Sequence, residues 1–114
     1  MFDYFRIACA VPDVEVADID FNINEMKKFI DEAKNKKVDL LVFPELGITG
    51  YTCGDLFFQE TLIKKASECI KELTDFTKGS ETAIAVGLPI IIDDALYNCG
   101  VIIYNGIVCG IVPK

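Results

Sequence analysis

Two residues of opposite charge stand where strands of a predicted sheet end. Glu45 follows Pro44 and the apolar run Val38 to Phe43, and Lys114 closely follows the apolar run Ile107 to Val112. Open α/β sheets build their sites at the carboxyl ends of strands, where a carboxylate can act as a general base. An ammonium delivered by a strand end can stabilise an oxyanion. The plainer interpretations, a hydrated loop carboxylate and an arbitrary last residue, are not rejected by composition alone.

The neighbours of Glu45 in the sequence favour the chemical interpretation. They are apolar on both sides, with Val42 and Phe43 before it and Leu46 and Ile48 after it. We therefore expect a poorly hydrated carboxyl group whose pKa is raised by desolvation, which makes a better general base near neutral pH.

The other reactive side chains exclude several classes of site. The five cysteines form no Cys-x-x-Cys pair and there is no histidine, so zinc-finger spacing and any Ser–His or Cys–His catalytic pair are excluded, and no metal site is expected. We expect reduced thiols, four of them small buried hydrophobes in strands or a helix: Cys9, Cys69, Cys99 and Cys109. Cys53, in a glycine-rich loop eight residues after Glu45, is the tempting nucleophile, but a nucleophile needs both an activating base in contact and a nearby oxyanion donor.

The composition of the chain limits the classes of partner that it can bind. Of the 114 residues 52% are hydrophobic, which argues for a large buried surface, and the net charge is -7. Nucleic acids and anionic membranes are disfavoured as partners because both attract clustered Lys and Arg. No signal peptide and no apolar run of membrane-spanning length is visible, so we expect a soluble cytoplasmic protein.

Hydrophobic periodicity predicts an α/β fold with a mixed sheet and two helices on one face. A capping box at Asn22 and Glu25 indicates where the first helix begins. In Ala83 to Leu88, large residues alternate with small ones, as in a central strand that a helix approaches closely. Asn105-Gly106 is a strong hairpin signal. The expected elements are a buried strand (5–11), a helix from about 22 to 37, a buried strand (38–43), a helix (59–78), and strands 83–88, 95–104 and 107–112.

One segment carries a resemblance to a known family. Leu41 to Leu46, continuing to Thr49 to Tyr51, is similar to the glutamate signature of the nitrilase superfamily, which cuts amide and nitrile C–N bonds with a Glu-Lys-Cys triad. Gly50 to Gln59 more narrowly resembles the glutaminase domain of glutamine-dependent NAD synthetases. The resemblance extends over the whole chain through five supporting segments: Phe5–Ala8, Val11–Val14, Gly87–Pro89, Leu96–Cys99 and Gly110–Lys114.

The resemblance implies roles for particular residues. Glu45 matches the general base of the family, and Lys114 matches the lysine that stabilises the oxyanion. Tyr51 either lines the substrate pocket or packs its loop. The family's nucleophilic cysteine lies on a later strand beyond the lysine, so we expect it to be absent from this chain. Cys53 then shapes the pocket entrance.

The resemblance also implies an organisation. Residues 1–114 are expected to be the N-terminal portion of a carbon-nitrogen hydrolase domain and to supply roughly half of an α-β-β-α sandwich. The remainder of that domain, and a synthetase domain that uses ATP and magnesium, lie outside the chain, and this segment itself needs no cofactor. The substrate is glutamine, and its ammonia serves to convert nicotinic acid adenine dinucleotide to NAD. The chain alone is expected to be inactive, and to form a homo-oligomer through an apolar sheet face that strands 83–112 expose.

Two alternatives stay open. One is a different nitrilase-superfamily amidase that acts on another small amide. The other is a non-catalytic α/β module for binding or assembly, which predicts that the charged ends of Glu45 and Lys114 lie far apart.

Overall fold

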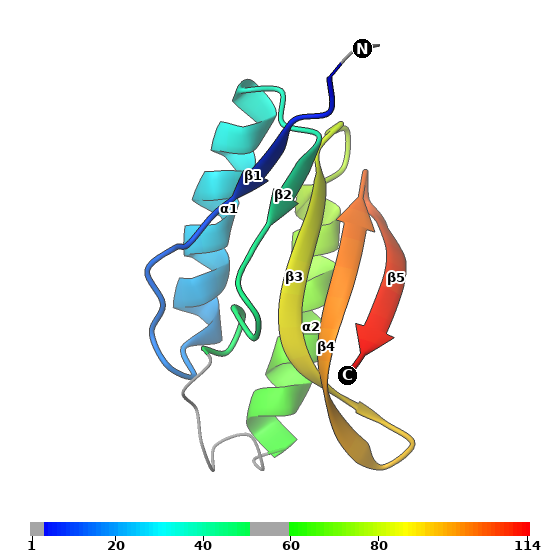
Figure 1. Cartoon of the computed structure of the whole chain (residues 1–114). Coiled ribbons are helices and arrows are strands. Elements are labelled where there is room, and N and C mark those ends of the chain that lie inside the picture. The colour runs from blue at the N-terminus through cyan, green and yellow to red at the C-terminus, as the bar shows by residue number, and fades with distance from the viewer. Residues whose placement is uncertain (1–3, 51–59) are drawn as a thin grey trace.

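The structure is a computed structural model that describes residues 4–50 and 60–114. Its sheet has five strands in the order β1-β2-β3-β4-β5, parallel from β1 to β3 and antiparallel from β3 to β5. Both helices lie on one face of this sheet (Figure 1). The predicted fold class is therefore confirmed. The elements are β1 (Ile7–Cys9), α1 (Ile19–Asn35), β2 (Leu40–Val42), α2 (Glu60–Phe76), β3 (Ala83–Ile92), β4 (Ala95–Tyr104) and β5 (Ile107–Pro113).

The core lies between the sheet and the two helices. Ile84, Val86 and Leu88 of β3 point into it and are buried, as are Val101 and Ile103 of β4. The prediction that Ala83 to Leu88 form a central strand with a helix on one face is thus confirmed, and the large residues are the ones that face the helices. The helices contribute a matching apolar stripe at helical spacing: Ile19, Ile23, Met26, Ile30, Leu62, Ala66, Cys69 and Leu73. Neither of these described helices is long and apolar enough to cross a membrane.

The start of α1 differs from the prediction. Asp18 is the N-cap, and its side chain accepts a hydrogen bond from the Phe21 amide, so the helix begins one turn before the predicted capping box. Asn22 is buried instead. Its Oδ1 accepts from the Glu15 amide, and its Nδ2 donates to the carbonyl oxygens of Glu15 and Ile48. The prediction that Asn22 caps the helix is therefore wrong, because its side chain forms hydrogen bonds that connect two loops.

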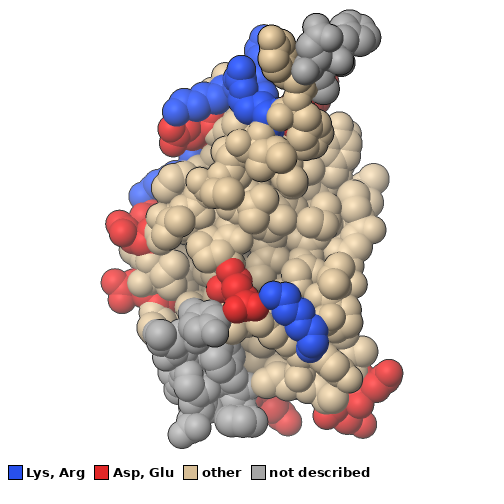
Figure 2. Space-filling view, in the orientation of Figure 1, with Lys and Arg blue, Asp and Glu red and all other residues tan. Residues whose placement is uncertain are grey.

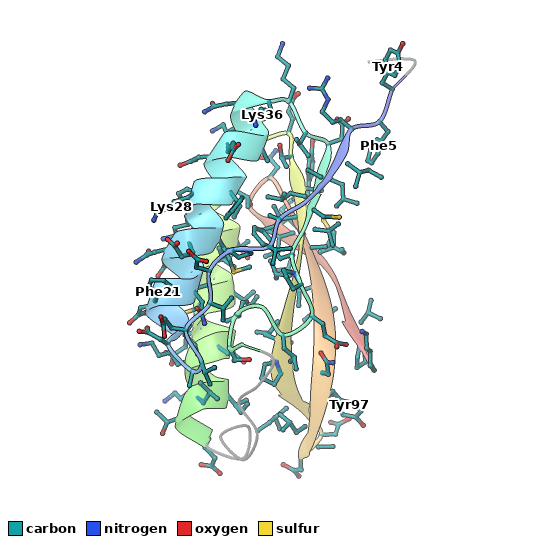
Figure 3. The ribbon with its side chains drawn as sticks, turned by 60° about the vertical axis from the view of Figure 1, so that its left-hand side comes forward. Tyr4, Phe5, Phe21, Lys28, Lys36 and Tyr97 are labelled. Atoms are coloured by element: carbon teal, nitrogen blue, oxygen red, sulfur yellow. The ribbon has the colours of Figure 1, made fainter. Side chains whose placement is uncertain are left out.

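The first strand is shorter and more exposed than predicted. Of the expected buried run Phe5 to Val11, only Ile7–Cys9 forms β1. It is an edge strand, and Ile7 is 59% exposed because its side chain faces away from the helices. Figure 3 likewise shows Phe5 on the side opposite the helices, whereas Lys28 and Lys36 extend outward from α1.

The four cysteines among the described residues divide into two buried and two exposed thiols, and Cys53 lies outside those residues. Cys69 and Cys99 are buried, as expected, but Cys9 and Cys109 are exposed free thiols. The expectation for the second pair was wrong because both lie in edge strands: Cys9 alternates onto the face that the helices do not cover, and Cys109 lies at a register shift between β4 and β5.

The predicted hairpin at Asn105-Gly106 is confirmed, with positive φ angles of 46° and 78° at its two turn residues. Its tip is held against the end of α2. Asn105 Oδ1 accepts from the Gly79 amide at 2.7 Å, and the Gly106 amide donates to Thr77 Oγ1 at 2.9 Å. The β4–β5 pair is therefore anchored to the helical layer at one end.

The face of the sheet away from the helices, hereafter the open face, is apolar, and no helix or strand of the described residues covers it. Figure 2 shows a broad area without charge over the strands, interrupted by one adjacent acidic and basic pair. The side chains that point to this face include large hydrophobic residues, as the sequence predicts: Ile91, Leu96, Ile102, Tyr104 and Val112.

Candidate active site

Glu45 and Lys114 meet on the open face. Lys114 Nζ lies 2.7 Å from Glu45 Oε1. The topology explains the meeting, because β4 is antiparallel to both β3 and β5, so that β5 runs in the same direction as β2 and β3. The residues that follow β2 and β5 therefore emerge at the same edge of the sheet. This is the geometry that the catalytic hypothesis requires and that the non-catalytic alternative does not predict.

A third residue, Asn98 of β4, joins the pair and was missed as a site residue. Its Nδ2 donates to Glu45 Oε1 at 2.8 Å, and its backbone carbonyl accepts from the Lys114 amide at 3.0 Å. The sequence holds a weak signal for it, since Asn98 lies in one of the segments that resemble the family. Its place between Glu45 and Lys114 follows from strand pairing, which the sequence does not show.

Gly87 of β3 lets the turn that carries Glu45 lie directly on the sheet. A Cβ atom at Gly87 would come 2.6 Å from the Leu46 amide nitrogen and 3.3 Å from the Glu45 carbonyl carbon. The Gly87 carbonyl accepts a hydrogen bond from the Ile48 amide. Leu46 has a φ of 53°, a conformation uncommon for a residue with a side chain. Strain of this kind often accompanies a functional turn.

The electrostatics of Glu45 differ from the sequence-based expectation. Its pKa is lowered, first by the hydrogen bond from Lys114, then by the bond from Asn98 and the positive charge of Lys114. The expected rise was wrong because the Glu45 side chain is 39% exposed. Its apolar neighbours Phe43 and Leu46 turn into the protein interior, so desolvation raises the Glu45 pKa less than Lys114 and Asn98 lower it. In this chain Glu45 is an ionised, hydrated carboxylate held beside a cation.

The three polar residues border a shallow hollow of about 200 Å³. It is lined by Phe43, Pro44, Glu45, Ala85, Val86, Gly87, Asn98, Cys99, Gly100 and Lys114. Burial raises the pKa of the Cys99 thiol, which favours the inert protonated form over a nucleophilic thiolate. Tyr51 and Cys53, the other two candidates from the sequence, lie outside the described residues. No group of acidic, cysteine or histidine side chains that could hold a metal ion occurs within residues 4–50 and 60–114.

A carboxylate and an ammonium are thus in contact at the carboxyl ends of two strands of an α/β sheet, where enzymes of this fold class place their sites. The model of the carbon-nitrogen hydrolase family matches residues 6–109. The chain belongs to that family.

Within the family, the chain is similar to glutamine-dependent NAD(+) synthetases, and it matches their N-terminal part. It is 33% identical over 109 residues to the enzyme of Oryza sativa subsp. indica, covering 96% of this chain and 15% of that protein. It is 34% identical over 99 residues to the enzyme of Aquifex aeolicus, and this match covers 87% of this chain and 17% of that protein. The chain thus spans under a fifth of the length of these two relatives.

Solved structures agree with the fold. The crystal structure of a glutamine-dependent NAD(+) synthetase from Cytophaga hutchinsonii superposes with a TM-score of 0.90 at 35% identity, over 96% of this chain and 19% of that one. An amidase from Nesterenkonia sp. gives a TM-score of 0.77 at 19% identity, over 96% and 42% of the two chains, which shows likeness of fold alone. The chain therefore corresponds to less than half of that nitrilase-fold neighbour.

Proposed function

We propose that this chain is the first part of the glutaminase domain of a glutamine-dependent NAD synthetase, with Glu45 as general base and Lys114 as oxyanion stabiliser. The observation that supports this most is the 2.7 Å contact between the two side chains. It occurs at the strand-end edge where open α/β sheets place their sites. The similarity to NAD synthetases over 96% of the chain gives the contact its context.

The proposed chemistry requires a cysteine supplied from outside these 114 residues. Glu45 takes the proton of that thiol as the sulfur attacks the side-chain carboxamide carbon of glutamine. Lys114 stabilises the tetrahedral oxyanion while the proton passes from Glu45 to the leaving nitrogen. Ammonia departs and a thioester remains. Glu45 then removes a proton from water, which attacks the thioester and releases glutamate and the thiol.

The same proposal covers the rest of the protein. A synthetase domain that uses ATP and magnesium receives the ammonia and amidates nicotinic acid adenine dinucleotide to NAD, in the cytoplasm. This segment itself binds no cofactor. The missing part of the domain covers the open face. When that part is absent, we expect copies of the chain to cover one another and form a homo-oligomer, because apolar surface of this extent favours association.

The test uses the chain alone and a chimera in which it replaces the matching N-terminal segment of the Cytophaga hutchinsonii relative. We expect no glutamate release from the chain alone and glutamine-dependent NAD formation by the chimera. Glu45→Gln and Lys114→Met should each lower glutamine-dependent turnover by roughly 100-fold or more. NAD formation from added ammonium chloride should persist, because it bypasses the glutaminase.

Glu72→Gln is the matched control. It removes the carboxylate of another ion pair, with Lys27, on the helical side of the molecule. Full glutamine-dependent activity in the Glu45→Gln chimera would overturn the proposal. Glutamate release by the chain alone, abolished by Cys53→Ser, would show that the nucleophile lies within the chain. Faster hydrolysis of a simple aliphatic amide than of glutamine would instead favour the second candidate, a different amidase.

A further inference from the structure

We propose that Asn98 is a positioning residue that fixes the Glu45 carboxylate by one oxygen and leaves the other oxygen, Oε2, to exchange protons with the nucleophile. This inference rests on the proposed function of Glu45 and deepens it. It assigns separate tasks to the two carboxylate oxygens.

Asn98 occupies the position between the two charged residues. Glu45 lies in the turn after β2, Lys114 follows β5, and Asn98 belongs to β4. Its side chain donates to Glu45 and its backbone carbonyl accepts from the Lys114 amide. One residue of β4 thus connects two segments that are 69 positions apart in the sequence.

The two donors converge on the same oxygen. Asn98 Nδ2 lies 2.8 Å and Lys114 Nζ 2.7 Å from Glu45 Oε1. Among residues 4–50 and 60–114, no group donates a hydrogen bond to Oε2. Because an oxygen already bound by two donors is a poor proton acceptor, Oε2 is the oxygen with lone pairs available for a thiol proton.

The orientation of the Asn98 carboxamide leaves one of its two polar atoms without a hydrogen bond among the described residues. Its Nδ2 must face the carboxylate, because a carboxylate oxygen only accepts hydrogen bonds. Its Oδ1 is consequently buried and has no hydrogen-bond partner within the described part of the chain. Such an unsatisfied buried acceptor is destabilising and calls for a reason. The bond to Glu45 supplies one.

A purely structural role for Asn98 can be separated from this one. The bond that holds β5 to β4 at this position uses the Asn98 backbone, so a change of side chain leaves it in place. The side chain acts on Glu45. Its removal should therefore change the protonation of Glu45 more than the folding of the sheet.

The first measurement is the titration of Glu45 in the 114-residue chain, followed by NMR of ¹³C-labelled glutamate carboxyl groups. Asn98→Leu, which is nearly isosteric, should raise the pKa of Glu45, and Asn98→Asp should raise it further because two carboxylates then face each other. The exposed Asn24→Leu is the matched control and should not change it. Besides Glu45, the titratable groups that line the hollow are Lys114 and Cys99.

The second measurement is glutaminase turnover in the chimera. We expect Asn98→Leu to lower kcat about tenfold, the factor that one charge-assisted hydrogen bond supplies, with little change in the KM for glutamine. Asn98→Asp should shift the acidic limb of the pH–kcat profile to higher pH.

The outcomes distinguish this inference from the proposed function. An unchanged Glu45 pKa in both Asn98 variants would overturn the positioning role, and so would an unchanged kcat in both variants when Glu45→Gln is inactive. If Glu45→Gln retains glutaminase activity, the proposed function fails, whatever the titration shows. Asn98→Asp keeps the test valid if Asn98→Leu does not fold.

Discussion

The two faces of strands β3 and β4 carry similar residue types, but one face is buried and the other is exposed. On the helix side, Val86 and Ile103 are almost completely buried, whereas on the open face Ile102 remains 37% and Leu96 40% exposed. Both faces are apolar, as is usual for strands that are covered on both sides. A sheet that faced water would show polar residues on its outer side. The composition of the open face is therefore that of a covered surface, and residues 4–50 and 60–114 provide no layer of helices or strands over it.

The one polar cluster described on the open face lies beside the turn after β2, which covers part of that face. The turn after β2 lies over Gly87, and Glu45, Asn98 and Lys114 form their contacts beside it. The helix side thus stabilises the fold, and the open face carries the proposed site. Substitutions on the two faces should therefore differ in their effects on stability and on self-association.

The neighbouring residues Ile102 and Ile103 give the sharpest comparison. Truncation of Ile103 to Ala removes a fully buried side chain and should lower the free energy of unfolding by about 2–5 kcal/mol. Ile102→Ala, one residue away on the open face, should cost about 1 kcal/mol or less. Urea unfolding at low protein concentration measures both. Equal losses would mean that the open face is as well covered in solution as the core.

Gly87 and Gly100 are cross-strand partners on the open face and form a second matched pair. A Cβ atom at Gly87 collides with the backbone of Leu46, so Gly87→Ala should cost about 1–3 kcal/mol and displace Glu45. A Cβ atom at Gly100 has no neighbour within 4 Å, so Gly100→Ala should be neutral or stabilising by up to about 1 kcal/mol. The same urea titrations measure these changes. The reverse order would show that the turn does not rest on β3 in solution.

Self-association tests the open face directly. We expect light scattering at crystallisation-like concentration to give a mass above the 12.6 kDa of one chain. Ile102→Lys should weaken the association at least tenfold, or about 1.4 kcal/mol, because it buries an unpaired charge. Ser67→Lys adds the same charge at an exposed position of α2 and should have no such effect. A monomeric wild-type chain would contradict the proposed homo-oligomer.

Much of the fold follows from local sequence. The hairpin is predictable from Asn105-Gly106 because turn chemistry is local, and the core face of β3 is predictable from the alternation between Ile84 and Leu88. The meeting of Glu45 and Lys114 follows from their places at strand ends once the hairpin sets β5 parallel to β2 and β3. These features depend on residues that are close together in sequence or on a simple topological rule.

The remainder depends on contacts between distant segments. Asn22 is of a residue type that commonly caps helices, but its side chain donates a hydrogen bond to the backbone of Ile48, 26 residues away. Asn98 becomes a site residue only when β4 pairs with β5. The pKa of Glu45 was predicted in the wrong direction because adjacent apolar residues in a sequence can turn to opposite sides of a sheet. Local hydrophobicity is therefore a poor guide to the hydration of a single carboxylate.

The smallest expected effect is the dependence of stability on pH that Glu45 contributes. Its pKa in the folded chain lies below the ordinary value of 4.5, so at intermediate pH the unfolded chain binds the proton more readily. The pair should therefore stabilise the fold above pH 4.5 and lose that contribution as the pH falls through the folded-state pKa. Solvent screening keeps the contribution small, because both side chains are substantially exposed.

The measurement is a double-mutant cycle of Glu45→Gln and Lys114→Met, with unfolding free energies determined from neutral to acidic pH. We expect a small favourable coupling at neutral pH that vanishes in acid and weakens with added salt. The largest cause of the lowered pKa is the bond from Lys114, so Lys114→Met alone should remove most of the pH dependence that Glu45 contributes. If the coupling persisted below the folded-state pKa, a neutral contact would hold the two side chains together. Glu45 and Lys114 would then be shielded from water on the open face. The two faces of the sheet would differ less in hydration than their exposed fractions indicate.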